Sequence, residues 1–236
     1  MKKNKTENVW LNIGCNIIIP SILLVKGRSI AEKFSLDCSN IDIWVFVIAL
    51  LFPIVYGIGD LVSRQKWNMI SIIGLASIVL TGGVGLMKLP TEWIIVKEGA
   101  IPLLLGAVVL ATAYTKRPLA KMIILSESVF DVEKIDNALQ ERNANDEFDK
   151  QMKNITYIVA ASFLLSSVLN FILAYYIFES PAGTPEFNEE VGKMTALSFP
   201  VIALPTAIIF IFAMMKFFKI LTRLTGLSLE DIMLKK

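Results

Sequence analysis

Six stretches of the chain carry no Asp, Glu, Lys or Arg for 17 residues or more, and polar segments separate them. They cover residues 8–25, 43–59, 67–87, 99–115, 154–178 and 194–215. A helix crosses the hydrocarbon core of a bilayer with about 20 apolar residues, and roughly 17 to 25 are tolerated. The pattern therefore predicts an all-α fold: a polytopic membrane helix bundle with six transmembrane helices, forming a single membrane domain over residues 1–236.

The longest polar segment, residues 116–153, lies between the fourth and fifth expected spans. Its Val132, Ile135 and Leu139 recur at helical spacing, which predicts a helix over residues 127–142 outside the membrane. Two interpretations of this helix stay open. Its thin apolar stripe rests on the bundle as part of a solvated helix, or the helix is a docking site for a partner.

A second amphipathic pattern follows the sixth expected span, in the carboxyl-terminal tail, residues 216–236. Lys216, Lys219 and Arg223 lie on one side of a helix rich in Phe and Leu, which is typical of a helix at the membrane interface. Gly226 is placed to end this helix.

The distribution of basic residues predicts the orientation of the bundle. The segments that alternate on one side of the six spans carry 17 Lys and Arg residues, and those on the other side carry 6. Because basic residues are enriched in cytoplasmic segments, both termini and residues 116–153 are expected in the cytoplasm. Trp and Tyr side chains gather near the span ends, as they do at membrane interfaces. We expect a multi-pass protein of the cell inner membrane, with the lipid bilayer as its first partner.

Composition narrows the chemistry. Hydrophobic residues make up 55% of the chain, and the mean hydropathy is +0.62. The sequence has no histidine, which argues against a His-ligated metal, a Ser-His triad or an imidazole base. Without clustered carboxylates facing one site, the residues assemble no catalytic constellation. We therefore expect no enzymatic activity, no cofactor, no metal site and no nucleic-acid partner.

The stretch KEGAIPLLLG, residues 97–106, is the main candidate for a polar site. Lys97 and Glu98 stand at the boundary of the fourth expected span, and Pro102 removes the amide that would bond to the Glu98 carbonyl. Either the charged pair caps the span, or it forms a polar site at membrane depth. Asn170 in the fifth span is explained by helix packing or by contact with a substrate.

Several segments together resemble the intracellular septation protein A-like six-span membrane families, over residues 43–215. These are residues 52–106, the later SFLLSSVLNFILAYYIF and the expected outer loop FNEEVGKMTALSFP. Lys97, Asn170 and Asn188 look like polar landmarks of those families, and the acidic segment 127–153 is longer than theirs. The resemblance implies a membrane protein of cell-envelope maintenance or division that acts through other membrane proteins.

Two functions follow as hypotheses. The first is a non-enzymatic membrane scaffold that binds envelope or division proteins through its cytoplasmic segment. The alternative is a small-molecule or ion transporter, as a homodimer, whose path is lined by Lys97, Glu98 and Asn170.

Overall fold

The computed structural model describes residues 9–34, 40–64, 69–115, 118, 121, 124–125 and 129–234, with the backbone alone at residue 9 and over 60–75. Over these residues the regular secondary structure is helical, with one isolated β-bridge and no strand, which confirms the expected all-α class. Asn8 and Trp67, where the first and third spans were expected to begin, lie outside the described residues. The elements are α1 (Val9–Ile13), η1 (Gly14–Ile18), α2 (Ile19–Lys33), α3 (Ile41–Arg64), α4 (Met69–Leu86), α5 (Glu92–Thr112), α7 (Val132–Glu141), α8 (Asn145–Ile177), α9 (Pro185–Ser198), η2 (Phe199–Ala203), α10 (Leu204–Thr225) and α11 (Leu229–Ile232).

Within the described residues, five helical stretches are long and apolar enough to cross a membrane, as expected of a multi-pass membrane protein. They are Trp10–Lys33, Ile41–Gly59, Glu92–Thr112, Asn145–Ile177 and Pro185–Thr225. The described apolar part of α4, Ala76–Leu86, is shorter, so the sixth span stays a prediction.

Two helices extend well beyond the expected spans. α8 begins at Asn145 rather than near residue 154, because Phe148 and Met152 bury an apolar face within a charged stretch. At 33 residues it is about 50 Å long, which exceeds the hydrocarbon thickness of roughly 30 Å. The last span begins at Pro185, where Thr184 caps α9 by accepting a hydrogen bond from the Phe187 amide. Residues expected in an outer loop are therefore helical.

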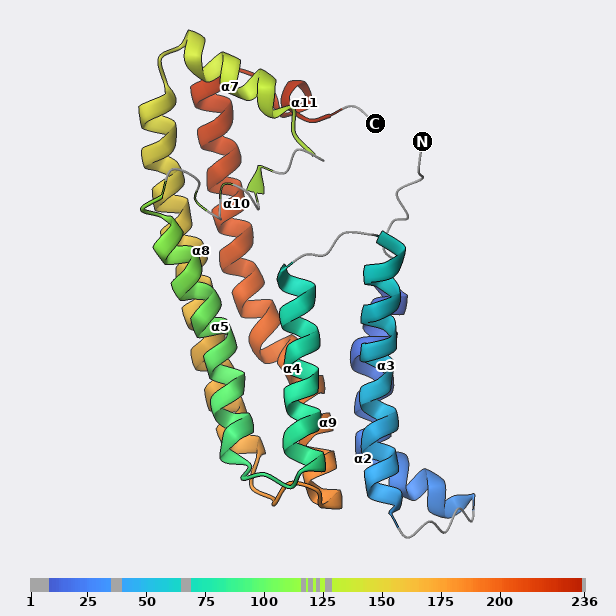
Figure 1. The fold of residues 1–236 in the computed structure, drawn as a ribbon. Helices are drawn as coiled ribbons and strands as arrows, with labels where there is room; N and C mark the ends of the chain where they lie inside the picture. The colour runs from blue at the N-terminus through green and yellow to red at the C-terminus, as the bar shows by residue number, and fades with distance from the viewer. Residues whose placement is uncertain are drawn as a thin grey trace. The chain divides into compact units, whose positions relative to one another are not determined.

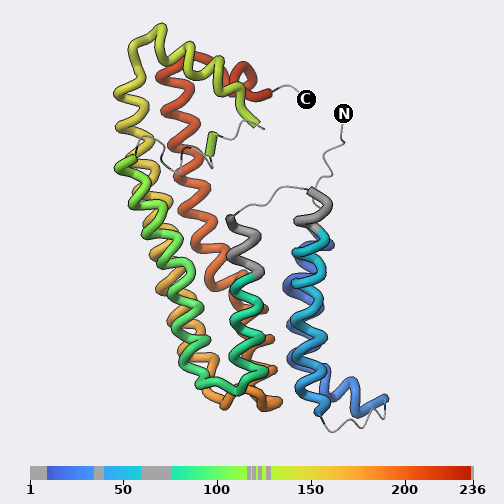
Figure 2. The backbone as a smooth tube through the Cα atoms, viewed as in Figure 1, coloured from blue at the N-terminus to red at the C-terminus, as the bar shows by residue number. Residues whose placement is uncertain are grey.

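Internal contacts divide the chain into two compact units. Unit 1 comprises residues 1–99 and 169–202, and unit 2 comprises residues 100–168 and 203–236. In unit 1, α2 lies beside both α3 and α9 (Figure 2). The Phe187 side chain is fully buried at the centre of this packing, with its ring centroid 6.0 Å from that of Phe46 and 5.9 Å from that of Phe178. Gly27 allows the close approach of α2 and α3, because a Cβ there would lie 2.6 Å from the Val45 side chain.

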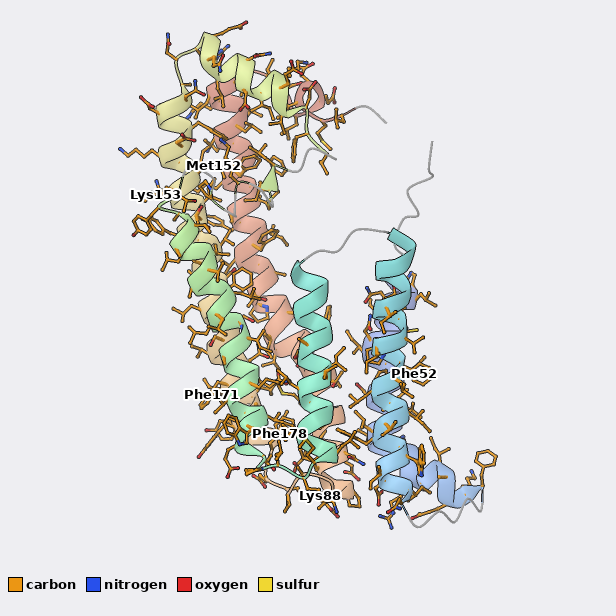
Figure 3. The ribbon with its side chains drawn as sticks, viewed as in Figure 1. Phe52, Lys88, Met152, Lys153, Phe171 and Phe178 are labelled. Atoms are coloured by element: carbon orange, nitrogen blue, oxygen red, sulfur yellow. The ribbon has the colours of Figure 1, made fainter. Side chains whose placement is uncertain are left out.

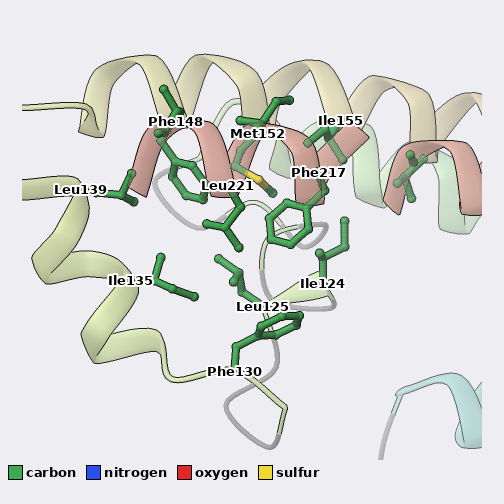
Figure 4. Packing of buried hydrophobic residues seen from close by; sticks show 14 of the residues in the cluster. Ile124, Leu125, Phe130, Ile135, Leu139, Phe148, Met152, Ile155, Phe217 and Leu221 are labelled. Atoms are coloured by element: carbon green, nitrogen blue, oxygen red, sulfur yellow. The ribbon is translucent and has the colours of Figure 1, made fainter. Parts of the chain in front are cut away.

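The core of unit 2 joins α7, α8, α10 and α11. Figure 4 shows the residues that α7, α8 and α10 contribute to it. Phe148, Met152 and Ile155 of α8 meet Phe217 and Leu221 of α10. Ile135 and Leu139 of α7 are fully buried in the same cluster, so the expected apolar stripe does pack against other helices.

Local hydrogen bonds fix the ends of the short helices in unit 2. α7 begins where the Asp131 side chain accepts from the Lys134 amide, and α11 begins with a capping box between Ser228 and Asp231. α11 contacts α7 (Figure 1), and the Asp131 amide donates to the Ile232 carbonyl at 2.9 Å. The carboxyl-terminal segment is therefore tied to the start of α7.

The tail expected as a separate interfacial helix begins as the last turns of α10. Its apolar face, including Phe217 and Leu221, is buried in the core of unit 2. Gly226 ends α10 as expected, with a left-handed φ of 68°. We name α7, α11 and the adjoining ends of α8 (145–155) and α10 (216–225) the polar helix layer.

Candidate functional site

Lys97 and Glu98 lie in α5, about one and a half turns after the helix begins at Glu92. The Lys97 ammonium is 2.6 Å from Oε1 of Glu98. The Lys97 side chain is only 9% exposed and that of Glu98 is 21% exposed. A pair that merely capped the span would be solvated, so this degree of burial favours a polar site within the helix packing.

Two hydroxyl groups of α4 complete the surroundings of Lys97. Nζ of Lys97 donates to Oγ1 of Thr81 at 2.7 Å and to Oγ of Ser77 at 3.3 Å. The Thr81 hydroxyl donates in turn to the Ser77 backbone carbonyl at 3.0 Å. The ammonium of lysine has three N–H donors, and here each has an acceptor. We name Lys97, Glu98, Ser77 and Thr81 the lysine cluster.

The position of these hydroxyls follows from the hairpin formed by α4 and α5. Residues at equal distances from the turn face each other in antiparallel helices, and Thr81 and Lys97 both lie eight residues from Leu89 in the turn. Ser77 is one helical turn from Thr81, on the same face of α4. Sequence reasoning did not identify Ser77 and Thr81, although this symmetry about the turn was a usable signal.

Chemically, the lysine cluster is closed rather than open. An ion pair with every ammonium donor satisfied holds α4 and α5 together, and it offers no lone nucleophile or base. Among the described residues, no group of three or more His, Cys, Asp or Glu side chains could hold a metal ion. The geometry therefore fits a polar clamp between two apolar helices.

The other three residues expected at this site belong to α5, α8 and α9. Pro102 is inside α5, about one turn after Glu98, and falls in unit 2. Asn170 is half-buried in α8 and belongs to unit 1. Asn188, expected in an outer loop, is instead a buried residue of α9, 4% exposed.

Asn188 takes part in a second polar cluster of unit 1. Its Nδ2 donates to the backbone carbonyl of Asp42 at 2.9 Å. The Asp42 carboxylate accepts from Nη1 of Arg28, also at 2.9 Å, and Nε of Arg28 donates to Glu32. These bonds join α2, α3 and α9, so Asn188 serves helix packing.

Glu190 is a buried acid that sequence reasoning missed. Only 8% exposed, it accepts from the Ser180 hydroxyl at 2.7 Å and from the Ser180 amide at 3.1 Å. These bonds fix the loop between α8 and α9, because a carboxylate without such donors would be costly to bury. The sequence carries no spacing signal for this contact.

Comparisons with protein-family models, with curated proteins and with solved structures give no match for this chain. The resemblance to the septation protein A-like families therefore rests on the residues quoted for it. The role in envelope maintenance or division that it implies stays a proposal.

Proposed function

We propose that this protein is a non-enzymatic scaffold of the cell inner membrane that binds membrane-protein partners through the polar helix layer. The observation that carries the proposal is the layer itself. It is a packed cluster of helices with its own buried core, and charged side chains cover its outer surface.

The exposed surface of the layer carries more acidic than basic residues. Its exposed acids include Glu133, Asp136, Glu141, Asp146 and Asp149. Nearby basic groups are partly engaged, since Nζ of Lys134 donates to the Asp231 carbonyl and Arg223 pairs with Glu147 at 2.7 Å. Complementary charge speeds association and selects partners, so a partner with a basic surface fits this face.

The proposed orientation places six spans in the membrane and both termini in the cytoplasm. The five apolar helical stretches, together with the 18-residue α4, supply these spans. The excess of Lys and Arg on the side of residues 116–153 supports a cytoplasmic position for the polar helix layer. With the resemblance described above, this favours a role in cell-envelope maintenance or division.

The test uses cells that lack the protein and show an envelope or division defect, scored by cell length and detergent sensitivity. Wild-type protein is expected to restore both, whereas the Glu133→Lys/Asp136→Lys variant is expected to insert and fold but fail to restore them. Glu189→Lys, an exposed change on α9 outside the layer, is the matched control and should restore both. Full rescue by the charge-reversed layer contradicts the proposal.

A second candidate, transport of a small molecule or ion, is favoured by one observation, the Lys97–Glu98 pair inside a helix that is otherwise apolar. The closure of the lysine cluster favours the scaffold instead. A path through the cluster predicts that Lys97→Cys reacts with a membrane-impermeant thiol reagent in intact cells and that Lys97 variants alter flux in proteoliposomes. A clamp predicts neither result.

A further inference from the structure

Unit 1 contains a cavity of about 670 Å³ between two connections. One wall is the turn from α4 to α5, and the other is the loop from α8 to α9. Lys88 and Phe178, which Figure 3 labels, come from the first and the second of these connections. Its volume lies within the range of roughly 300 to 1,000 Å³ that small-molecule sites occupy. We name it the end pocket.

The end pocket lies at the level where apolar helices end. α4 ends at Leu86, α5 begins at Glu92, and α8 ends at Ile177. Trp93 beside it is 62% exposed, and indole rings concentrate where a membrane meets water. A cavity at the ends of membrane-crossing helices is at the depth of lipid head groups.

Lys88 supplies a cation in an unusual backbone conformation. Its φ is 53°, a value that residues other than Gly, Asn and Asp rarely adopt. The Lys88 side chain lies against Gly183, where an added Cβ would be 2.9 Å from Cγ of Lys88. In the described part of the chain, its ammonium has no ion pair or side-chain hydrogen bond. Backbone strain of this kind concentrates at ligand sites, where surrounding structure maintains it.

Two carboxylates, Glu92 and Glu179, also line the end pocket. Both are exposed, and neither forms an ion pair or side-chain hydrogen bond among the described residues. The loop that carries Glu179 is held in place, because the Thr91 hydroxyl donates to the Ser180 carbonyl at 2.9 Å and Glu190 binds the same residue. The wall is therefore fixed before any ligand binds, which lowers the entropic cost of binding.

The base of the end pocket is apolar. Phe178 is 5% exposed, Ala182 is buried, and Ile95 is partly buried. A ligand that satisfies the whole lining therefore carries an anion, a cation that can donate hydrogen bonds, and an apolar portion. Free phosphate supplies only the anion. A simple metal cation supplies only positive charge and has no N–H donor.

We propose that the end pocket binds the phosphoethanolamine head group of a membrane phospholipid. Lys88 pairs with the phosphodiester, and the primary ammonium donates to Glu92 and Glu179. The first carbons of the lipid glycerol and acyl chains lie against Phe178 and Ile95. A choline head group has no N–H donor for the carboxylates, and a glycerol head group has no cation, so both should bind less tightly.

The test measures binding of three phospholipids to the full-length protein in detergent by native mass spectrometry. Phosphatidylethanolamine, phosphatidylcholine and phosphatidylglycerol with identical acyl chains are compared. Phosphatidylethanolamine is expected to bind about tenfold more tightly than either, the scale of one charge-assisted hydrogen bond.

Three variants connect the preference to the end pocket. Lys88→Asn removes the cation but suits the left-handed backbone, and it should lower phosphatidylethanolamine affinity about tenfold. Lys88→Arg should retain most of the affinity. Glu92→Gln/Glu179→Gln should remove the preference over phosphatidylcholine. Lys193→Gln, an exposed change on α9 outside the pocket, is the control and should have no effect.

Equal affinity for the three lipids overturns the proposal, and so does wild-type binding by Lys88→Asn with an unchanged melting temperature. Soluble glycerophosphoethanolamine distinguishes the two sources of the head group. If it binds as tightly as the lipid, the ligand is a free phosphodiester and the lipid assignment is wrong. Should Lys88→Asn fail to fold, the Glu92→Gln/Glu179→Gln variant alone decides, because loss of head-group preference is required.

Discussion

Replacing Lys97 by Met tests whether the lysine cluster is a clamp between α4 and α5. The change keeps an unbranched side chain of similar length and removes the ammonium that bonds to Glu98, Thr81 and Ser77. Breaking a buried ion pair from one side costs about 3 to 5 kcal/mol, because the partner charge stays in low dielectric. We expect Lys97→Met to lower the free energy of unfolding by about 3 kcal/mol, at the lower end of this range. The reason is that Glu98 is one-fifth exposed and the Thr81 hydroxyl keeps its own acceptor.

The reverse change, Glu98→Gln, should cost less. Lys97 keeps both hydroxyl acceptors, and the Gln amide oxygen replaces the carboxylate, so a loss of about 1 to 2 kcal/mol is expected. In the double variant no unpaired charge is left near α4. It should therefore be more stable than Lys97→Met alone, which is a coupling of the two residues.

The assay is reversible unfolding in mixed detergent micelles, followed by circular dichroism, for the wild type, both single variants and the double variant. The matched control is the Lys193–Glu189 pair on α9, whose atoms are 3.9 Å apart and whose side chains are 56% and 50% exposed. Its cycle should give a coupling within about 0.5 kcal/mol. Additive losses below about 1 kcal/mol at Lys97 and Glu98, like those of the control, would refute the clamp.

Three further changes test the packing of each unit through the same unfolding assay. Asn188→Leu removes the bond from α9 to an α3 carbonyl and should cost about 1 kcal/mol, whereas an unchanged stability would show that the bond is dispensable. Glu190→Ala leaves the Ser180 donors without their acceptor and should cost about 1 to 3 kcal/mol, with a wild-type value counting against a fixed loop. Gly226→Ala imposes a side chain on a left-handed residue next to Arg142 and should cost at least about 1 kcal/mol; a neutral effect would contradict the close contact.

The helical class and the approximate positions of the apolar helices could be predicted from the sequence. The reason is that the thickness of the bilayer's hydrocarbon core sets how many consecutive residues of a spanning helix must be uncharged. The helix ends that lie beyond the apolar stretches were harder to predict. α8 extends into charged residues because Phe148 and Met152 find a core in α7 and α10, and that partner surface is not visible from one segment. The start of α9 did have a signal, since Thr184 followed by Pro185 is a common helix opening.

The candidate site was predictable in part. Two adjacent opposite charges at a span boundary identified Lys97 and Glu98, but their burial depends on packing against α4. Ser77 and Thr81 could not be singled out, because hydroxyl groups are too common in membrane helices. Asn188 was singled out through the family resemblance, whereas its bond to the Asp42 carbonyl joins residues 146 positions apart. Contacts of this range depend on the packed fold rather than on local pattern.

The most direct test of the scaffold account is the side of the membrane on which the polar helix layer lies. In a background with Cys15 and Cys38 replaced by Ala, single cysteines are placed at the exposed positions Gln140 in α7 and Glu189 in α9. A membrane-impermeant maleimide should label the cysteine at 189 in intact cells, and the cysteine at 140 only after the membrane is permeabilised. Labelling of the cysteine at 140 in intact cells would place the layer outside the cytoplasm and contradict the account.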